Sequence, residues 1–271
     1  MGRFLLALPE GEIVTGVTSL DNQLFVLRAN SSQQEQVEIY DINTCRLLRC
    51  VTVPGLGNTD DIVACGHHRC AYISDQSHDS IHRLALPDAT IAQWPVDETP
   101  AGLSVTNRHG LLVTCWKVRK IKEFSTDGQL LHVLTLPEDV LSPSHAIQLS
   151  SGQLIVSHGV AATHLHRVCL IGSDDTVVKS FGGPKGSGIH NMNMPYHLAV
   201  DGNGFVFVGD LTNGRVLLLS PQLSYVREVV SHKHLRWSPR RVHLDSMRGR
   251  LYVTVSGGRR MAGRVLVVSL Y

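Results

Sequence analysis

Two histidines of this sequence share one local context, which makes them the first candidates for chemistry. They lie in the segments Pro143-Ser144-His145 and Pro195-Tyr196-His197. A catalytic zinc generally takes three protein ligands and leaves one position open. The corresponding places elsewhere in the chain carry Gly16, Asp61, Gly102 and Arg241. Only Asp61 offers a third ligand, and Arg241 would put a permanent positive charge beside the ion. His145 and His197 are therefore weak metal candidates, and we expect them to bind water or backbone.

A group of basic side chains near the end of the chain is the second candidate. No acidic residue lies between Ser231 and Leu244 or between Ser256 and Arg264. The basic set within and beside these stretches is Lys233, Arg236, Arg240, Arg241, Arg259 and Arg260, and a smaller secondary set is Trp116, Lys117, Arg119 and Lys120. Such residues suit an acidic protein segment or single-stranded RNA, whose bases stack on aromatic rings. The pI of about 8.3 is below the value of about 9 that marks nucleic-acid-binding domains, so we favour a protein partner.

Other kinds of site find little support in the sequence. Lys185 lies among the glycines of 182–194, but the segment lacks the Gly-Lys-[Ser/Thr] of a phosphate-binding loop. No Gly-x-Ser-x-Gly marks a nucleophilic serine. The six cysteines do not have the spacing of a zinc site. We therefore expect no catalytic residue, no nucleotide and no other cofactor.

The elements that must position these residues come from a unit that recurs six times. The clearest copy runs from Pro195 to Val229 and consists of four short apolar segments separated by turn residues. The second segment of each copy recurs at intervals of 40 to 52 residues, at Phe25, Tyr72, Leu112, Ile155, Phe207 and Tyr252. A four-stranded unit of this size is typical of a propeller blade.

The repeat predicts an all-β fold, a six-bladed β-propeller of four-stranded antiparallel blades, as a single domain over residues 1–271. The last copy ends on its third strand, and we expect residues 3–8 to supply the fourth. The predicted blades span approximately 13–50, 58–94, 99–135, 142–181, 194–230 and 238–270 with 3–8. Loops between blades and loops joining second to third strands form one rim, here called the inter-blade rim. The tight turns form the opposite rim, here called the turn rim. The basic residues are expected on the inter-blade rim.

The fifth copy resembles the NHL repeat in its Pro-x-x-x-Ala-Val-Asp-x-x-Gly-x-Val-x-Val-x-Asp pattern from Pro195 to Asp210, followed by Asn213 and Arg215. The resemblance implies a propeller like those that end TRIM-type ubiquitin ligases, which bind proteins or RNA. The same family includes peptidyl-hydroxyglycine amidating lyases, whose zinc histidines lie at the place of His145 and His197.

The sequence therefore predicts a non-catalytic recognition or scaffold module that binds a protein partner through the inter-blade rim, as in the substrate-recognition propeller of a TRIM-type ligase. One alternative is a single-stranded RNA-binding NHL propeller, and another is a metal-dependent lyase or hydrolase. A hydrophobic share of 43% with a net charge of +2 excludes a disordered chain. No apolar run is long enough to cross a bilayer, and no secretory signal is evident, so we expect a cytoplasmic protein without membrane contact.

Overall fold

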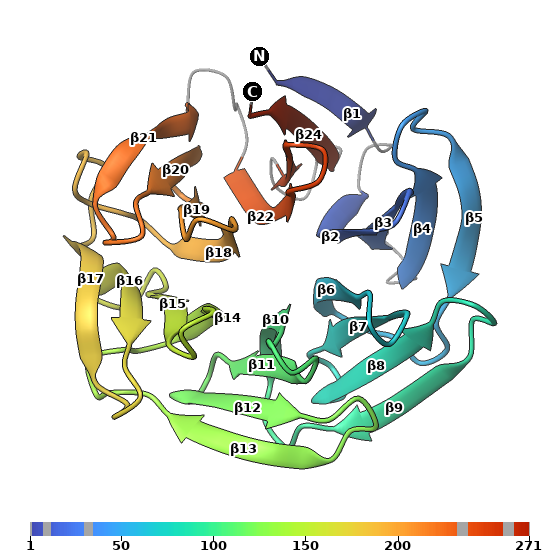
Figure 1. The fold of residues 1–271 in the computed structure, drawn as a ribbon, viewed down its shortest axis with the longest axis horizontal. Helices are drawn as coiled ribbons and strands as arrows, with labels where there is room; N and C mark the ends of the chain where they lie inside the picture. The colour runs from blue at the N-terminus through green and yellow to red at the C-terminus, as the bar shows by residue number, and fades with distance from the viewer. Residues whose placement is uncertain (1, 8–11, 30–34, 232–237, 257–262, 271) are drawn as a thin grey trace.

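A computed structural model describes residues 2–7, 12–29, 35–231, 238–256 and 263–270 of this protein. Over these residues every regular element is a β-strand, and the strands form six antiparallel four-stranded sheets around a central axis (Figure 1). The prediction of an all-β, six-bladed propeller is confirmed. No helix in this part of the chain is long and apolar enough to span a membrane.

The first three blades follow one another along the chain, each with its strands in sequence order from the axis outward. Their strands are β2 (Ile13–Leu20), β3 (Gln23–Ala29), β4 (Glu35–Asp41) and β5 (Leu47–Thr52), then β6 (Thr59–Cys65), β7 (Cys70–Asp75), β8 (Ser80–Ala85) and β9 (Ile91–Pro95), then β10 (Pro100–Val105), β11 (Leu111–Cys115), β12 (Lys120–Phe124) and β13 (Leu130–Thr135).

The last three blades repeat this order and close the ring. Their strands are β14 (Pro143–Gln148), β15 (Leu154–His158), β16 (Leu165–Ile171) and β17 (Val177–Pro184), then β18 (Pro195–Val200), β19 (Val206–Asp210), β20 (Arg215–Leu219) and β21 (Tyr225–Val230), then β22 (Ser238–Asp245), β23 (Arg250–Ser256), β24 (Arg264–Ser269) and, from the other end of the chain, β1 (Arg3–Ala7).

Closure of the ring depends on β1, which pairs antiparallel with β24, as the sequence predicted. The two ends of the chain consequently lie close together (Figure 1). Because β1 covers the outer edge of β24, the sixth blade has the same four strands as the others and that edge of β24 is not open to another chain.

The hydrophobic core lies between neighbouring blades. The described apolar residues form six clusters, each contributed mainly by two adjacent blades. Phe25 and Ile39 of the first blade, for example, pack with Ile62 and Ile73 of the second. A strand such as β7 is buried along its whole length because both of its faces contact a neighbouring blade. The outermost strands are mostly exposed, as in β13.

The innermost strand of every blade carries a register irregularity at the same level. In β14 it lies between Pro143 and His145, and in β18 between Pro195 and His197. In the other four inner strands the pairing register shifts near Gly16, near Asp61, near Gly102 and before Arg241. A bulge re-aims the side chain beside it. This repeated bulge determines which residues meet at the axis.

Candidate functional site

Four polar side chains from four blades converge at the axis next to these bulges. They are Asp61 of β6, His145 of β14, His197 of β18 and Arg241 of β22. All four are buried, and Arg241 is only 1% exposed. We call them, together with Asp60, the axial cluster. The places named in the sequence as equivalent thus lie together in space, although they are as many as 180 residues apart.

The carboxylate of Asp61 accepts four hydrogen bonds. Oδ2 accepts from the backbone N–H of Leu103 at 2.9 Å and lies 3.0 Å from Nε2 of His197. Oδ1 accepts from its neighbour's amide, that of Ile62, at 3.0 Å and from Nε of Arg241 at 3.1 Å. Burial alone would raise the pKa of Asp61, but His197 and Arg241 outweigh burial and hold that pKa well below its ordinary value. Asp61 is therefore an ionised carboxylate whose oxygens are already occupied.

Arg241 also pairs with the second carboxylate, that of Asp60, at 2.6 Å. A further hydrogen bond joins its guanidinium to the backbone carbonyl of Asp60. The ring of Tyr196 lies 4.7 Å from the guanidinium carbon, within cation–π range, and its hydroxyl donates to Asp60 at 3.0 Å. Arg240 donates to the same carboxylate oxygen at 2.9 Å. Two carboxylates and two guanidinium groups therefore balance one another at this point of the axis.

His145 is engaged at both ring nitrogens. Nδ1 accepts from the backbone N–H of Leu198 at 3.2 Å, which leaves Nε2 to donate to the carbonyl of Leu103 at 3.0 Å. Burial and, to a smaller extent, the neighbouring His197 together lower the pKa of His145 to about 3. The two imidazole rings stack with their centroids 3.8 Å apart. His145 is thus a neutral ring that links the inner strands of three blades.

The axial cluster contains three groups of the kinds that bind metals. Ligand atoms of Asp61, His145 and His197 lie within 4.8 Å of one another. A metal would nevertheless have to displace a hydrogen bond at His145, and Asp61 already accepts one from a guanidinium. An open catalytic zinc site needs ligands with free lone pairs. The contacts therefore fit a hydrogen-bonded network better than a resident ion.

The predicted basic set divides into three parts. Lys233, Arg236, Arg259 and Arg260 lie outside the described residues. Arg240 is partly exposed at the inter-blade rim, where it pairs with Asp60. Arg241 differs from the prediction, because its side chain points into the axis and is buried against two carboxylates. A partner on the rim would not reach it. Asp60 and Asp61, which neutralise the charge of Arg241, lie about 180 residues earlier in the sequence. The sequence around Arg241 therefore gave no sign that its charge is paired.

The secondary set lies on the loop between β11 and β12 and on Lys120, the first residue of β12. Lys117 is exposed, and its ammonium lies 5.6 Å from the ring of Trp116. Arg119 donates to the carbonyl of Leu136 at 3.1 Å. Lys120 pairs with Glu98 at 2.7 Å. Lys117 is consequently the most available cation of this loop.

The aspartates that end the second strands fix the loops of the inter-blade rim. Asp210 accepts from the backbone N–H of Asn193 and from Nε of Arg215, both at 2.8 Å. The guanidinium of Arg215 also donates to carbonyls of Gly188 and Asn191, in the connection between β17 and β18. Asp210 and the basic residue before the third strand therefore hold a long rim loop in place.

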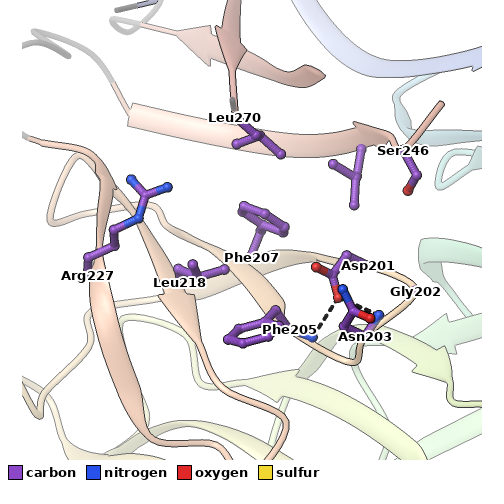
Figure 2. A pocket seen from close by; sticks show the side chains of 10 residues that line it. Asp201, Gly202, Asn203, Phe205, Phe207, Leu218, Arg227, Ser246 and Leu270 are labelled. Carbon is purple, nitrogen blue, oxygen red and sulfur yellow. Dashed lines mark hydrogen bonds between the residues drawn. The ribbon is translucent and has the colours of Figure 1, made fainter. Parts of the chain in front are cut away.

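A separate cavity of about 260 Å³ opens on the turn rim between the fifth and sixth blades. Figure 2 shows the rings of Phe205 and Phe207 with Leu218 and Leu270 around it, and Arg227 at one side. The carboxylate of Asp201 accepts from the backbone N–H of Asn203 and of Phe205 (Figure 2), which caps a turn. The lining of the cavity is polar and apolar in nearly equal parts, and it lacks a convergent set of reactive groups.

Comparison with known proteins supports the fold and no narrower family. No protein-family model matches the sequence, and no curated protein matches it. A streptogramin B lyase structure is similar with a TM-score of 0.68 at 10% identity, covering 99% of this chain and 98% of the other. The hydrazine synthase of Kuenenia stuttgartiensis has a TM-score of 0.68 at 14% identity, over 97% and 96% of the two chains.

A chain of the nidogen–laminin complex is similar with a TM-score of 0.68 at 14% identity, over 86% of this chain and 85% of the other. At these identities the likenesses show the propeller fold alone. The NHL resemblance gains no support from a family model.

Proposed function

We propose that this protein is a non-catalytic recognition module that binds a protein partner through the inter-blade rim. The observation that carries the proposal is the state of the axial cluster. The oxygens of Asp61 and both ring nitrogens of His145 are engaged by the protein itself. Side chains whose polar atoms are already hydrogen-bonded within the protein stabilise the ring and are poorly placed to act on a substrate. Binding by the exposed loops is the function that remains.

The inter-blade rim over the fourth blade has the features of a docking surface. Leu141, between β13 and β14, is 46% exposed, and Ile189, between β17 and β18, is 58% exposed. Backbone hydrogen bonds tie the loops beneath them, from Gly159 to Ser142 and from Lys185 to His164. Apolar side chains on loops that are already ordered lose little conformational entropy on binding. Lys117, on the adjacent blade, adds a positive charge that favours an acidic segment.

The comparisons give limited support to this proposal. One structural neighbour belongs to a protein complex, that of nidogen and laminin. Two finer proposals from the sequence, a place in a TRIM-type ligase and a cytoplasmic location, stand beside it. Fractionation of cells that produce the protein would test the second, and a test for ubiquitin-ligase activity in the complexes captured with it would test the first.

Capture from native extract with matched variants tests the proposed surface. Ile189→Glu and Lys117→Glu should each reduce recovery of the partner at least tenfold. Met247→Glu is the control, because Met247 is 96% exposed on the turn rim, between β22 and β23. The captured partner should resist nuclease, and the amount captured should fall only modestly between 50 and 200 mM salt, as expected for a contact that combines one exposed charge with apolar side chains. Equal capture by all variants, or an RNA partner whose affinity falls steeply with salt, would reject the proposal.

A metal-dependent lyase or hydrolase is the second candidate, favoured by the convergence of Asp61, His145 and His197 within 4.8 Å. One structural neighbour is a streptogramin B lyase. Elemental analysis of protein purified without chelators distinguishes the two functions. About one zinc per chain that is lost in His145→Ala would favour the enzyme, and a metal content unaffected by that change would favour the recognition module.

A further inference from the structure

Three imidazole rings from two blades meet on the turn rim, far from the axial cluster. His67 and His68 belong to the turn between β6 and β7, and His109 to the turn between β10 and β11. The rings of His67 and His109 are stacked, with centroids 4.0 Å apart and planes at 4°. His68 is edge-on to both, at 4.7 Å from His67 and 6.2 Å from His109. The fold thus joins a His-His pair to a third histidine about forty residues later.

The two turns hold these residues at defined backbone positions. The amide of His109 donates to Thr106 at 2.9 Å, and His109 has a φ of +65° in the left-handed region. Among the described residues, no hydrogen bond or ion pair involves the side chains of His67, His68 or His109. This is the opposite of His145, where both ring nitrogens are engaged. The three exposed or half-buried rings therefore keep lone pairs available.

Further ligand groups lie beside the three rings. A cavity of about 560 Å³ is lined by His68 and His109 and also by Glu123 and His132. Glu123 and His132 are direct cross-strand partners in β12 and β13, so their side chains share one face of the sheet. A carboxylate and a fourth imidazole are therefore within the same hollow.

We propose that His67, His68 and His109 form a binding site for a divalent transition-metal ion such as Zn²⁺ or Ni²⁺. Imidazole nitrogen is a preferred ligand of both ions. With metal–nitrogen bonds of about 2.0–2.1 Å, two rings bound to one ion have centroids about 5 Å apart. In the structure the rings of His67 and His109 are stacked with their planes at 4°, so at least one exposed ring must rotate before both nitrogens can point at one ion. Glu123 or His132 completes the coordination, and the ion links the second blade to the third.

Titration calorimetry of the full chain with ZnCl₂ and with NiCl₂ tests this site. We expect one ion per chain at this site with a micromolar or lower Kd. His109→Ala and His67→Ala should each weaken binding at least tenfold. His164→Ala is the matched control, because His164 is also exposed but lies on the inter-blade rim, and it should bind as the wild type does.

A structural readout locates the ion independently of affinity. In ¹H–¹⁵N spectra of the wild type, Zn²⁺ should shift the ring nitrogens of His67, His68 and His109. It should also raise the Tm of the wild type and leave that of His109→Ala unchanged. Failure of either ion to bind more tightly than about 1 mM, or full-affinity binding by His109→Ala, would overturn the proposal. Shifts confined to His145 and His197 would also overturn it.

Discussion

The substitution Arg241→Met removes the guanidinium that compensates two buried carboxylates. Arg241 lies 2.6 Å from Asp60 and 3.1 Å from Asp61, and all three side chains are almost fully buried. Methionine replaces the aliphatic part of the arginine side chain and carries no charge. The variant therefore leaves two negative charges close together with one remaining guanidinium, that of the partly exposed Arg240.

The expected loss of stability follows from this burial. Breaking a buried ion pair by removing one partner costs about 3–5 kcal/mol, because the other charge stays desolvated. Domains have free energies of unfolding of about 5–15 kcal/mol, so the loss is a large share of the total. For a chain of this length, 1 kcal/mol corresponds to about 2 °C in Tm. Arg241→Met should therefore lower the Tm by about 6–10 °C.

The destabilisation should depend on pH with a definite sign. In the wild type the pKa of Asp61 is held below its ordinary value, so its stabilising contribution is complete at neutral pH and is lost only below about pH 4. Without Arg241, Asp60 loses the largest charge that offsets its burial and Asp61 loses the second largest, after His197, so the folded-state pKa of both carboxyl groups rises. Protonation then relieves the charge as the pH falls. The difference between variant and wild type should be largest at pH 7 and smaller at pH 5.

Urea unfolding followed by circular dichroism measures these differences, with Arg69→Met as the control. Arg69 pairs with Asp21 at 3.0 Å, but both side chains are 58% exposed, so its loss should cost less than about 1 kcal/mol. The double variant Asp61→Asn, Arg241→Met should recover part of the stability lost in Arg241→Met. Equal effects of Arg241→Met and Arg69→Met would refute the view that the axial cluster stabilises the ring.

Three further predictions concern the stability and closure of the ring. Burial lowers the pKa of His145 to about 3 and that of His158 and His243 to about 4, so the unfolded chain takes up protons that the folded chain does not. The free energy of unfolding, from urea curves, should therefore fall between pH 7 and pH 5, and a flat profile would contradict this. Gly102→Ala should cost about 1–3 kcal/mol, because its Cβ would lie 2.5 Å from the neighbouring blade, whereas Gly202→Ala meets open space and should cost less than 1. Deletion of β1 should uncover the edge of β24 and cause aggregation visible by light scattering, and a monomeric truncated chain would argue against closure by β1.

The fold was predictable because the same order of strands and turns recurs in all six copies of the repeat. Once the second strands of six copies are aligned, every innermost strand begins at an equivalent place. His145, His197 and Asp61 could then be assigned to equivalent places of the repeat from the sequence alone. Closure by the N-terminal strand followed from the missing fourth strand of the last copy.

The partners of individual side chains were not predictable in the same way. The stretch around Arg241 contains no acidic residue, so in sequence it has the character of an exposed basic cluster. The compensating Asp60 and Asp61 come from another blade, and a bulge determines which residue faces them. The contact between His67 and His109 likewise depends on two turns in adjacent blades. The local sequence does not show which way a side chain points after a bulge. It also does not show which turn of the neighbouring blade a given turn will contact.

The protonation state of the His145 ring tests most directly whether the axial cluster is a structural network. Two-dimensional ¹H–¹⁵N spectra of the imidazole nitrogens distinguish the tautomers and detect metal coordination. At pH 7 we predict a neutral ring protonated at Nε2, with Nδ1 as acceptor, unchanged when one equivalent of Zn²⁺ is added. A ring whose Nδ1 or Nε2 resonance moves to the metal-bound position, in the protein as purified or on adding zinc, would contradict the account.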